Sequence, residues 1–247
     1  PLQELLRKFH TGEYQLPAFQ RPFVWRIRQT LNLLDSLLRG YPISVIYLWK
    51  PEANSKLRPK PPTKGGPPQV ERFEAYIIDG QQRLTSLHAA FGFAELSDAR
   101  GRSLECWLEL GNPDDRDGRV TRLFQSPAQK KWLEHAESQQ QPWRIGLGDL
   151  VDVDHQKMRS DRAAQLQLAG CSQEECDEAS KRIGAAYEMM KTPITCITIT
   201  QADDEEVLEV FKRLNRGGTG LKDRDVKAAD LGIGKSVEVL QEIQTFV

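Results

Sequence analysis

The stretch Ala75-Tyr76-Ile77-Ile78-Asp79-Gly80-Gln81-Gln82-Arg83 decides the fold, because an apolar strand meets a helix within it. Its first four residues form the continuous apolar run of a short buried strand. Leu84, Leu87 and Phe91 then recur at helical spacing. Gly80 makes the turn between the two elements sterically accessible. The stretch therefore predicts a strand, a tight turn and a helix.

This turn also predicts an anion site. The first backbone N–H groups of a helix have no partner within it, so we expect them to point outward beside Arg83. Unpaired amides, the positive end of a helix and a guanidinium together suit phosphate. Asp79 is placed to hold Mg²⁺, which usually arrives with a nucleotide. The plain alternative is a capped strand–helix turn with a surface arginine.

Composition limits the functional classes. The chain has 247 residues and a formal net charge of −1, so it is not a basic nucleic-acid-binding protein over its whole surface. DNA contact would have to come from a local patch, and a solvated charged face is the alternative. The candidate patch lies within the first 28 residues and contains Arg7, Lys8, Arg21, Arg26 and Arg28.

The four cysteines are scattered, with no CxxC pair and no histidine at ligand spacing. This pattern argues against a zinc site and favours reduced thiols. We find no signal peptide and no apolar run long enough to span a membrane, and we expect a cytoplasmic protein. The chain does not begin with Met, and the apolar-periodic segment 237–247 has no stop signal after it. We therefore expect a fragment of a longer protein.

The remaining pattern predicts an α+β fold: a small mixed sheet with surrounding helices, followed by a mainly helical portion. We expect a core domain over residues 1–125 and the helical portion over 126–247. Six prolines and two glycines interrupt residues 51–69, which predicts a mobile insertion. We expect helices at 2–9, 27–38 and 207–214. We expect strands at 45–49, 104–110 and 119–125, and a further strand at 193–200 that returns to the core. Ser172/Glu175 and Asp203/Glu206 are predicted capping boxes.

Three polar clusters lie at the ends of regular elements. One is Pro17 to Trp25, where prolines stiffen a turn that presents Gln20 and Arg21. Another is the Asp79–Arg83 turn. The last is the glycine-rich segment 215–220, where backbone amides can approach a ligand closely. Packing anchors and helix C-caps are the alternatives for the first and last clusters.

The order LPAFQRPFVW, YIIDGQQRLTSL and FKRLNRGGTGL resembles the N-terminal domain of GmrSD-type modification-dependent restriction proteins. That family is assigned to the ParB/sulfiredoxin-like superfamily. The resemblance extends from about Leu2 to about Asp230, and the DGQQR motif is its most specific part. It implies a ParB-like α+β core that binds a nucleoside triphosphate, often hydrolyses it, and regulates a nuclease directed against phage DNA.

The resemblance also implies roles for individual residues. The DGQQR segment is the nucleotide and catalytic motif of the family. The family's glutamine–arginine pair before the tryptophan is matched by Gln20 and Arg21, and the asparagine of its late motif falls on Asn215. A C-terminal nuclease domain follows in many relatives. The implied catalytic residues are Asp79, Gln81, Gln82 and Arg83, with Asp79 also the metal ligand; the implied nucleotide-binding residues are Gln20, Arg21, Gly80, Arg83, Asn215, Gly217 and Gly218.

Three functions stay open at this point. The leading hypothesis is an NTPase control domain that takes Mg²⁺ with GTP, ATP or CTP, in which Gln81 or Gln82 positions the attacking water. The second is a metal-dependent DNA-nicking domain, although the turn offers no second acid. The third is a sensor of modified DNA in which Phe19, Phe23 and Trp25 line a pocket. The sequence distinguishes neither the base, nor the DNA modification, nor a homodimer from a monomer.

Overall fold

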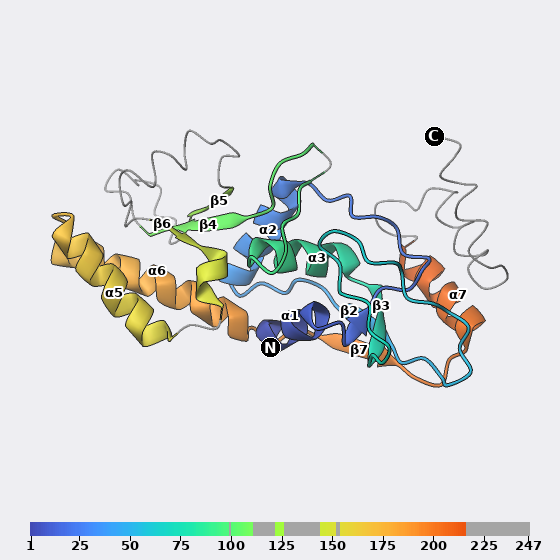
Figure 1. The fold of residues 1–247 in the computed structure, drawn as a ribbon. Helices are drawn as coiled ribbons and strands as arrows, with labels where there is room; N and C mark the ends of the chain where they lie inside the picture. Colours follow the sequence, from blue (N-terminus) through green and yellow to red (C-terminus); the bar gives the residue numbers. More distant parts are fainter. Residues whose placement is uncertain (99, 111–121, 126–143, 152–153, 216–247) are drawn as a thin grey trace. The chain divides into compact units, whose positions relative to one another are not determined.

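The computed structural model describes residues 1–98, 100–110, 122–125, 144–151 and 154–215 (Figure 1). Residue contacts group the chain into two compact units, and each contains its own sheet. In described residues, the sheet unit comprises 7–23, 44–84 and 194–215, and the hairpin unit comprises 1–6, 24–43 and the remainder of 85–193. The division at residue 125 expected from the sequence is a different partition and stays a prediction.

The sheet unit contains a four-stranded mixed sheet in the order β1-β3-β2-β7. The central pair, β3 (Ala75–Asp79) and β2 (Ile46–Trp49), is antiparallel, with a register shift between Tyr47 and Leu48. The outer strands β1 (Tyr14–Gln15) and β7 (Cys196–Ile199) run parallel to their neighbours. The central position explains why β3 is apolar at four successive residues, since a strand covered on both faces buries every side chain.

Helix α7 (Asp204–Asn215) packs against β3 and contributes to the core of the sheet unit. Phe211 on α7 contacts Phe19, with ring centroids 4.7 Å apart. Trp49 stacks on Tyr76 at 5.6 Å and donates its indole N–H to the carbonyl of Ala202. Phe19, from the Pro17–Trp25 cluster, is therefore a core anchor, and it fixes that turn beside the sheet.

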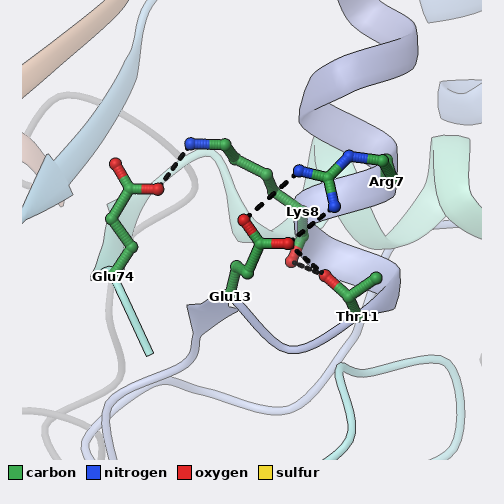
Figure 2. A network of polar contacts seen from close by, with 5 residues as sticks. All are labelled: Arg7, Lys8, Thr11, Glu13 and Glu74. Atoms are coloured by element: carbon green, nitrogen blue, oxygen red, sulfur yellow. Dashed lines mark hydrogen bonds and ion pairs between the residues drawn. The ribbon is translucent and has the colours of Figure 1, made fainter. Parts of the chain in front are cut away.

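A polar network fastens the end of helix α1 (Leu2–His10) to the strands that follow it (Figure 2). Arg7 Nη1 donates to Glu13 Oε1 at 2.6 Å, and the Thr11 hydroxyl donates to the same oxygen at 3.0 Å. Lys8 forms an ion pair with Glu74, the residue before β3. Two cations of the predicted basic patch thus have carboxylate partners within the sheet unit. DNA contact by the patch stays a prediction.

The hairpin unit combines a three-stranded antiparallel sheet with helices. Its strands run in the order β5-β4-β6 and are β4 (Cys106–Glu109), β5 (Arg122–Gln125) and β6 (Arg144–Gly146). Helix α2 (Ile27–Leu38) contacts β5 and α6. The 3₁₀ helix η1 (Leu147–Leu150) leads toward a helical hairpin of α5 (His155–Leu168) and α6 (Gln173–Lys191), visible in Figure 1.

The structure confirms the predicted α+β class and most of the local predictions. Ser172 and Glu175 form the expected capping box, and Asp203 and Glu206 exchange the equivalent hydrogen bonds. The strand predicted at 193–200 is β7, which joins the sheet beside β2. Among the described residues, no helix is both long and apolar enough to cross a lipid bilayer. The segments expected at 111–121, 126–143 and 216–247 lie outside the described residues.

Candidate functional site

The turn at Gly80 joins β3 to helix α3 (Gln81–Ala90), as the sequence predicts. Gly80 has φ = +100°, a backbone conformation that side chains with a Cβ rarely adopt. A Cβ at this position would also lie 2.3 Å from Ile46 Cδ1. Both the backbone angle and the close approach of β2 therefore require glycine here. The turn brings Asp79, at the end of the strand, next to the first turn of the helix.

Arg83 is engaged within this turn rather than extended into solvent. Its Nη2 donates to Asp79 Oδ2 at 2.9 Å and to the carbonyl of Val45 at 2.8 Å. The arginine side chain is 12% exposed, whereas the Asp79 side chain is 35% exposed. The sequence predicts an outward guanidinium, but an i,i+4 spacing across the strand–helix turn places Arg83 beside the carboxylate. The carbonyl of Val45, just before β2, is a further acceptor for the guanidinium.

The electrostatics of this pair are set by burial. Burial lowers the pKa of Arg83, while the charge and hydrogen bond of Asp79 oppose that shift. An arginine remains protonated under such conditions, so the turn keeps a positive charge close to its surface. The Asp79 carboxylate pairs with Arg83 through Oδ2, and its Oδ1 lies outside this ion pair. Of the two side chains, that of Asp79 is the more exposed. A single partly exposed carboxylate fits Mg²⁺, which takes one or two carboxylates together with phosphate oxygens.

Three glutamines hold the loop of residues 20–22, here named the Arg21 loop, against this turn. Gln20 is buried, and its Nε2 donates to the carbonyls of Ile77 and Ile78 at 2.9 and 2.8 Å. Gln81 Nε2 donates to the carbonyl of Arg21 at 3.1 Å. Gln82 Nε2 donates to the carbonyl of Pro22 at 3.0 Å.

The structure thus brings residues 20–22 of the first predicted cluster together with the Asp79–Arg83 turn in the sheet unit. The glutamine side chains bridge segments about sixty residues apart in the sequence, which the sequence alone did not indicate. Gln81 is also buried, and its Oε1 has no hydrogen-bond partner among the described residues. A buried acceptor of this kind is usually satisfied by water or a ligand.

Lys60 is a site-associated residue that the sequence analysis missed. Its Nζ donates to the carbonyls of Gln20 and Arg21 at 2.8 and 3.1 Å. It lies in the segment 51–69, where proline content predicts a mobile insertion. The pairing of Pro59 with Pro17 fixes this part of the segment along the start of the first cluster. The mobility of the rest stays a prediction.

The last predicted cluster is described only at its first residue. Asn215 ends α7 and donates its side-chain amide to the carbonyl of Phe211 at 2.9 Å. Phe211 packs on Phe19, just before Gln20, so α7 is tied to the Arg21 loop through the core. Gly217 and Gly218 lie outside the described residues, and their predicted roles stay predictions.

The aromatic residues proposed to line a DNA-sensing pocket differ in burial. Phe19 is buried in the core of the sheet unit, whereas Phe23 and Trp25 are partly exposed. Trp25 belongs to the hairpin unit. Within the described ranges, no group of three or more His, Cys, Asp or Glu side chains is placed to hold a metal ion. A metal at the turn would therefore rely on Asp79 and on a ligand's own oxygens.

Comparison with known proteins gives a decisive match. The sequence model of the protein family "GmrSD restriction endonuclease, N-terminal domain" matches residues 2–231. The chain belongs to this family.

The match to the GmrSD family includes residues of both units. An uncharacterized protein of Methanocaldococcus jannaschii is 32% identical to the chain over 100 residues. That stretch is 36% of this chain and 16% of the relative, so the chain spans a small part of the relative's length. The link of this GmrSD N-terminal domain to the ParB/sulfiredoxin-like superfamily stays a prediction.

Proposed function

We propose that this GmrSD N-terminal domain binds a nucleoside triphosphate with Mg²⁺ at the Asp79–Arg83 turn and uses it to regulate a restriction endonuclease. The observation that supports this most directly is the arrangement of the Asp79–Arg83 pair. A partly exposed carboxylate stands in front of a largely buried guanidinium, at the first turn of a helix. This combination offers a metal ligand and a positive charge at one point on the sheet unit.

Each residue of the site has a distinct task in this proposal. Asp79 holds Mg²⁺ through the oxygen that is not paired with Arg83. Arg83 supplies the fixed charge that favours phosphate, and Arg21 contacts the phosphates from the loop held opposite. Gln20 and Gln82 keep the Arg21 loop in place through their hydrogen bonds to main-chain carbonyls. Asn215, Gly217 and Gly218 complete the nucleotide site from the end of α7.

Hydrolysis is the second part of the proposal. Phosphoryl transfer requires mainly positioning and neutralisation of charge, which two arginines and Mg²⁺ supply. Mg²⁺, when bound with the nucleotide, neutralises the phosphate oxygens. The buried Oε1 of Gln81 has no partner among the described residues and is an acceptor for the hydrogen of an attacking water. Gln81 and Gln82 are both candidates for positioning the water. We assign this role to Gln81 because its Oε1 has no hydrogen-bond partner among the described residues.

The family name supports the regulatory part of the proposal. A domain of a restriction endonuclease that carries a nucleotide site can couple nucleotide state to DNA cleavage by the remainder of the enzyme. Modified phage DNA is the proposed target of that cleavage, and the full-length enzyme is the proposed carrier of the nuclease.

Calorimetric titration tests nucleotide binding. We expect GTP, ATP or CTP to bind the intact chain with one site in the presence of Mg²⁺, and release of inorganic phosphate to follow. Arg83→Ala is expected to lower affinity by about tenfold or more, because it removes a charge-assisted contact. Arg39→Ala is the matched control, since Arg39, the residue after α2, forms an exposed i,i+4 pair with Asp35.

The same experiment identifies the contrary outcome. If no triphosphate binds the intact folded chain, the proposal is wrong. If Arg83→Ala loses folding, Arg83→Lys retains the charge while removing the two-acceptor geometry of the guanidinium, and it serves as the second variant. Nicking of supercoiled DNA that requires metal but no nucleotide would favour a nuclease function for this domain instead.

A further inference from the structure

We infer that Lys60 is a positioning residue for the proposed nucleotide site, and that it acts by holding the main chain of the Arg21 loop. The inference deepens the proposed function and rests on it for the identity of the ligand. It assigns a task to a residue outside all three sequence clusters. It also makes the proline-rich segment a part of the site.

The contacts of Lys60 support this assignment. Its ammonium group donates to two successive carbonyls, those of Gln20 and Arg21, at 2.8 and 3.1 Å. Hydrogen bonds from a charged donor are shorter and stronger than those between neutral groups. The carbonyl of Arg21 also accepts from Gln81. The peptide that carries the Arg21 side chain is therefore held by a cation from one side chain and an amide from another.

Lys60 is itself fixed at its backbone. Its N–H donates to the carbonyl of Leu16 at 2.7 Å, and the N–H of Ala18 donates to the carbonyl of Arg58 at 3.0 Å. The segment around Pro59 therefore lies along the chain just before the Arg21 loop. The side chain of Lys60 then reaches forward over the next turn. Because the backbone of Lys60 is already fixed, binding of its ammonium group costs only the entropy of the side chain.

Side chains from two other segments hold the main chain of the Arg21 loop: Lys60 from the proline-rich segment, and Gln81 and Gln82 from the start of α3. Each of the carbonyls of Gln20, Arg21 and Pro22 accepts a hydrogen bond from a side chain of another segment. Lys60 provides the charged donor of this set. A displacement of about 1 Å at a phosphate-binding arginine is enough to weaken a site strongly, so the donor that fixes its main chain affects affinity.

The test compares Lys60→Met with Lys60→Arg and with Lys56→Met. Methionine keeps the length and apolar stem of lysine and removes the ammonium group. Lys56 is exposed and lies in the same segment, which makes it the matched control. Using the probe ATP, GTP or CTP that binds the wild type with Mg²⁺, we expect Lys60→Met to raise Kd about tenfold. Lys60→Arg is expected to recover part of that loss, and Lys56→Met to change nothing.

A double-mutant cycle with Arg21→Ala separates positioning from general stability. If Lys60 acts through Arg21, Lys60→Met has no further effect on Kd once Arg21 is alanine. A merely structural role would lower affinity equally in both backgrounds. Equal effects in the two backgrounds, or an unchanged Kd in Lys60→Met, would overturn the inference.

Hydrogen exchange distinguishes failure of this inference from failure of the proposed function. The amides of residues 18–23 in the unliganded chain should exchange faster in Lys60→Met than in the wild type or Lys56→Met. A wild type that binds no nucleotide refutes the proposed function and, with it, the nucleotide role of Lys60, while faster exchange in Lys60→Met still shows that Lys60 holds the loop. If amide exchange is unchanged in Lys60→Met, Lys60 does not hold the Arg21 loop, whether or not the chain binds a nucleotide.

Discussion

Two aspartate–arginine pairs with the same i,i+4 spacing occur in the two units, and their burial is reversed. In the hairpin unit, the Asp98 side chain is fully buried and Arg102 is 40% exposed. In the sheet unit, Arg83 is 12% exposed and Asp79 is 35% exposed. The buried member of a pair is committed to the protein, and the exposed member can face a ligand. The two pairs therefore have different capacities despite their shared spacing.

The hydrogen-bond partners of Asp98 and Asp79 differ in the same sense as their burial. Asp98 accepts hydrogen bonds from the backbone amides of Ile27, Arg100 and Arg102, as well as from the Arg102 side chain. It thereby joins the start of α2 to the turn that contains Gly101. Asp79 is bonded in the structure to Arg83, and its other oxygen lies outside that pair. We therefore treat Asp98 as structural and Asp79 as available to a metal ion.

Replacement of Asp98 is expected to have the largest effect on stability. Asp98→Ala leaves three backbone amides, that of Ile27 buried, and an arginine without their acceptor, so we expect the free energy of unfolding to fall by about 3 kcal/mol. Urea denaturation measures the change. Asp35→Ala, which removes the carboxylate of an exposed pair, is the control and should change stability little. A loss no larger than that of the control would show that Asp98 is not a structural centre.

The pH dependence of stability provides a second test of Asp98. Burial alone raises the pKa of this carboxyl, but the hydrogen bonds from Arg102 and from the amides of Ile27 and Arg100 outweigh burial and lower it below its ordinary value of 3.8. Because the pKa in the folded state is lowered, the stabilisation is fully present above pH 3.8 and is lost as pH falls through the folded-state pKa. The difference in unfolding free energy between the wild type and Asp98→Asn should therefore shrink below about pH 4. A difference that is constant down to acid unfolding would contradict this.

Gly80→Ala tests the geometry of the turn that sets Asp79 and Arg83 side by side. The left-handed backbone and the contact with Ile46 both oppose a side chain, and we expect a loss of about 2 kcal/mol in unfolding free energy. Ile46→Val removes the Cδ1 atom that the new methyl group would meet. In the double variant, part of the loss should be recovered, because the steric conflict is relieved and the backbone strain remains. No recovery would assign the whole cost to the backbone.

The sequence predicts the local structure of this site well and its long-range contacts poorly. The strand, the turn at Gly80 and the helix follow from apolar periodicity and from one glycine. The contacts of Gln81 and Gln82 cannot be predicted in this way, because a side-chain amide that binds a main-chain carbonyl about sixty residues away leaves no local sequence pattern. Lys60 shows the same limit, since its proline-rich surroundings indicate a loop but not what that loop contacts.

The burial of ion pairs is equally hidden from the sequence. Asp79 and Asp98 are each followed by an arginine four residues later and have a glycine nearby. The different roles that we propose for them rest on which side chain the remainder of each unit covers. That property is set by packing of distant segments, such as the approach of Val45 to Arg83. Spacing alone therefore identifies a pair without identifying its task.

Asp79→Asn is expected to change stability least and to separate the two pairs most clearly. The asparagine oxygen can still accept from Arg83, and the site is partly exposed to solvent, so we expect a loss of about 1 kcal/mol or less in unfolding free energy. Nucleotide affinity with Mg²⁺ should fall to the value measured in excess chelator, because the amide is a poor ligand for Mg²⁺. Urea denaturation measures the change in stability, and calorimetric titration with and without Mg²⁺ measures the two nucleotide affinities.

Asp98→Asn is the matched variant for this last experiment, because it makes the same chemical change at the same spacing. Its folded fraction should keep the full Mg²⁺ dependence of binding while losing more stability than Asp79→Asn. If Asp79→Asn keeps the Mg²⁺ dependence of the wild type, the carboxylate of Asp79 has a structural task like that of Asp98. Reversed burial would then be a consequence of packing, and the metal would have to be held by the nucleotide and by residues other than this pair.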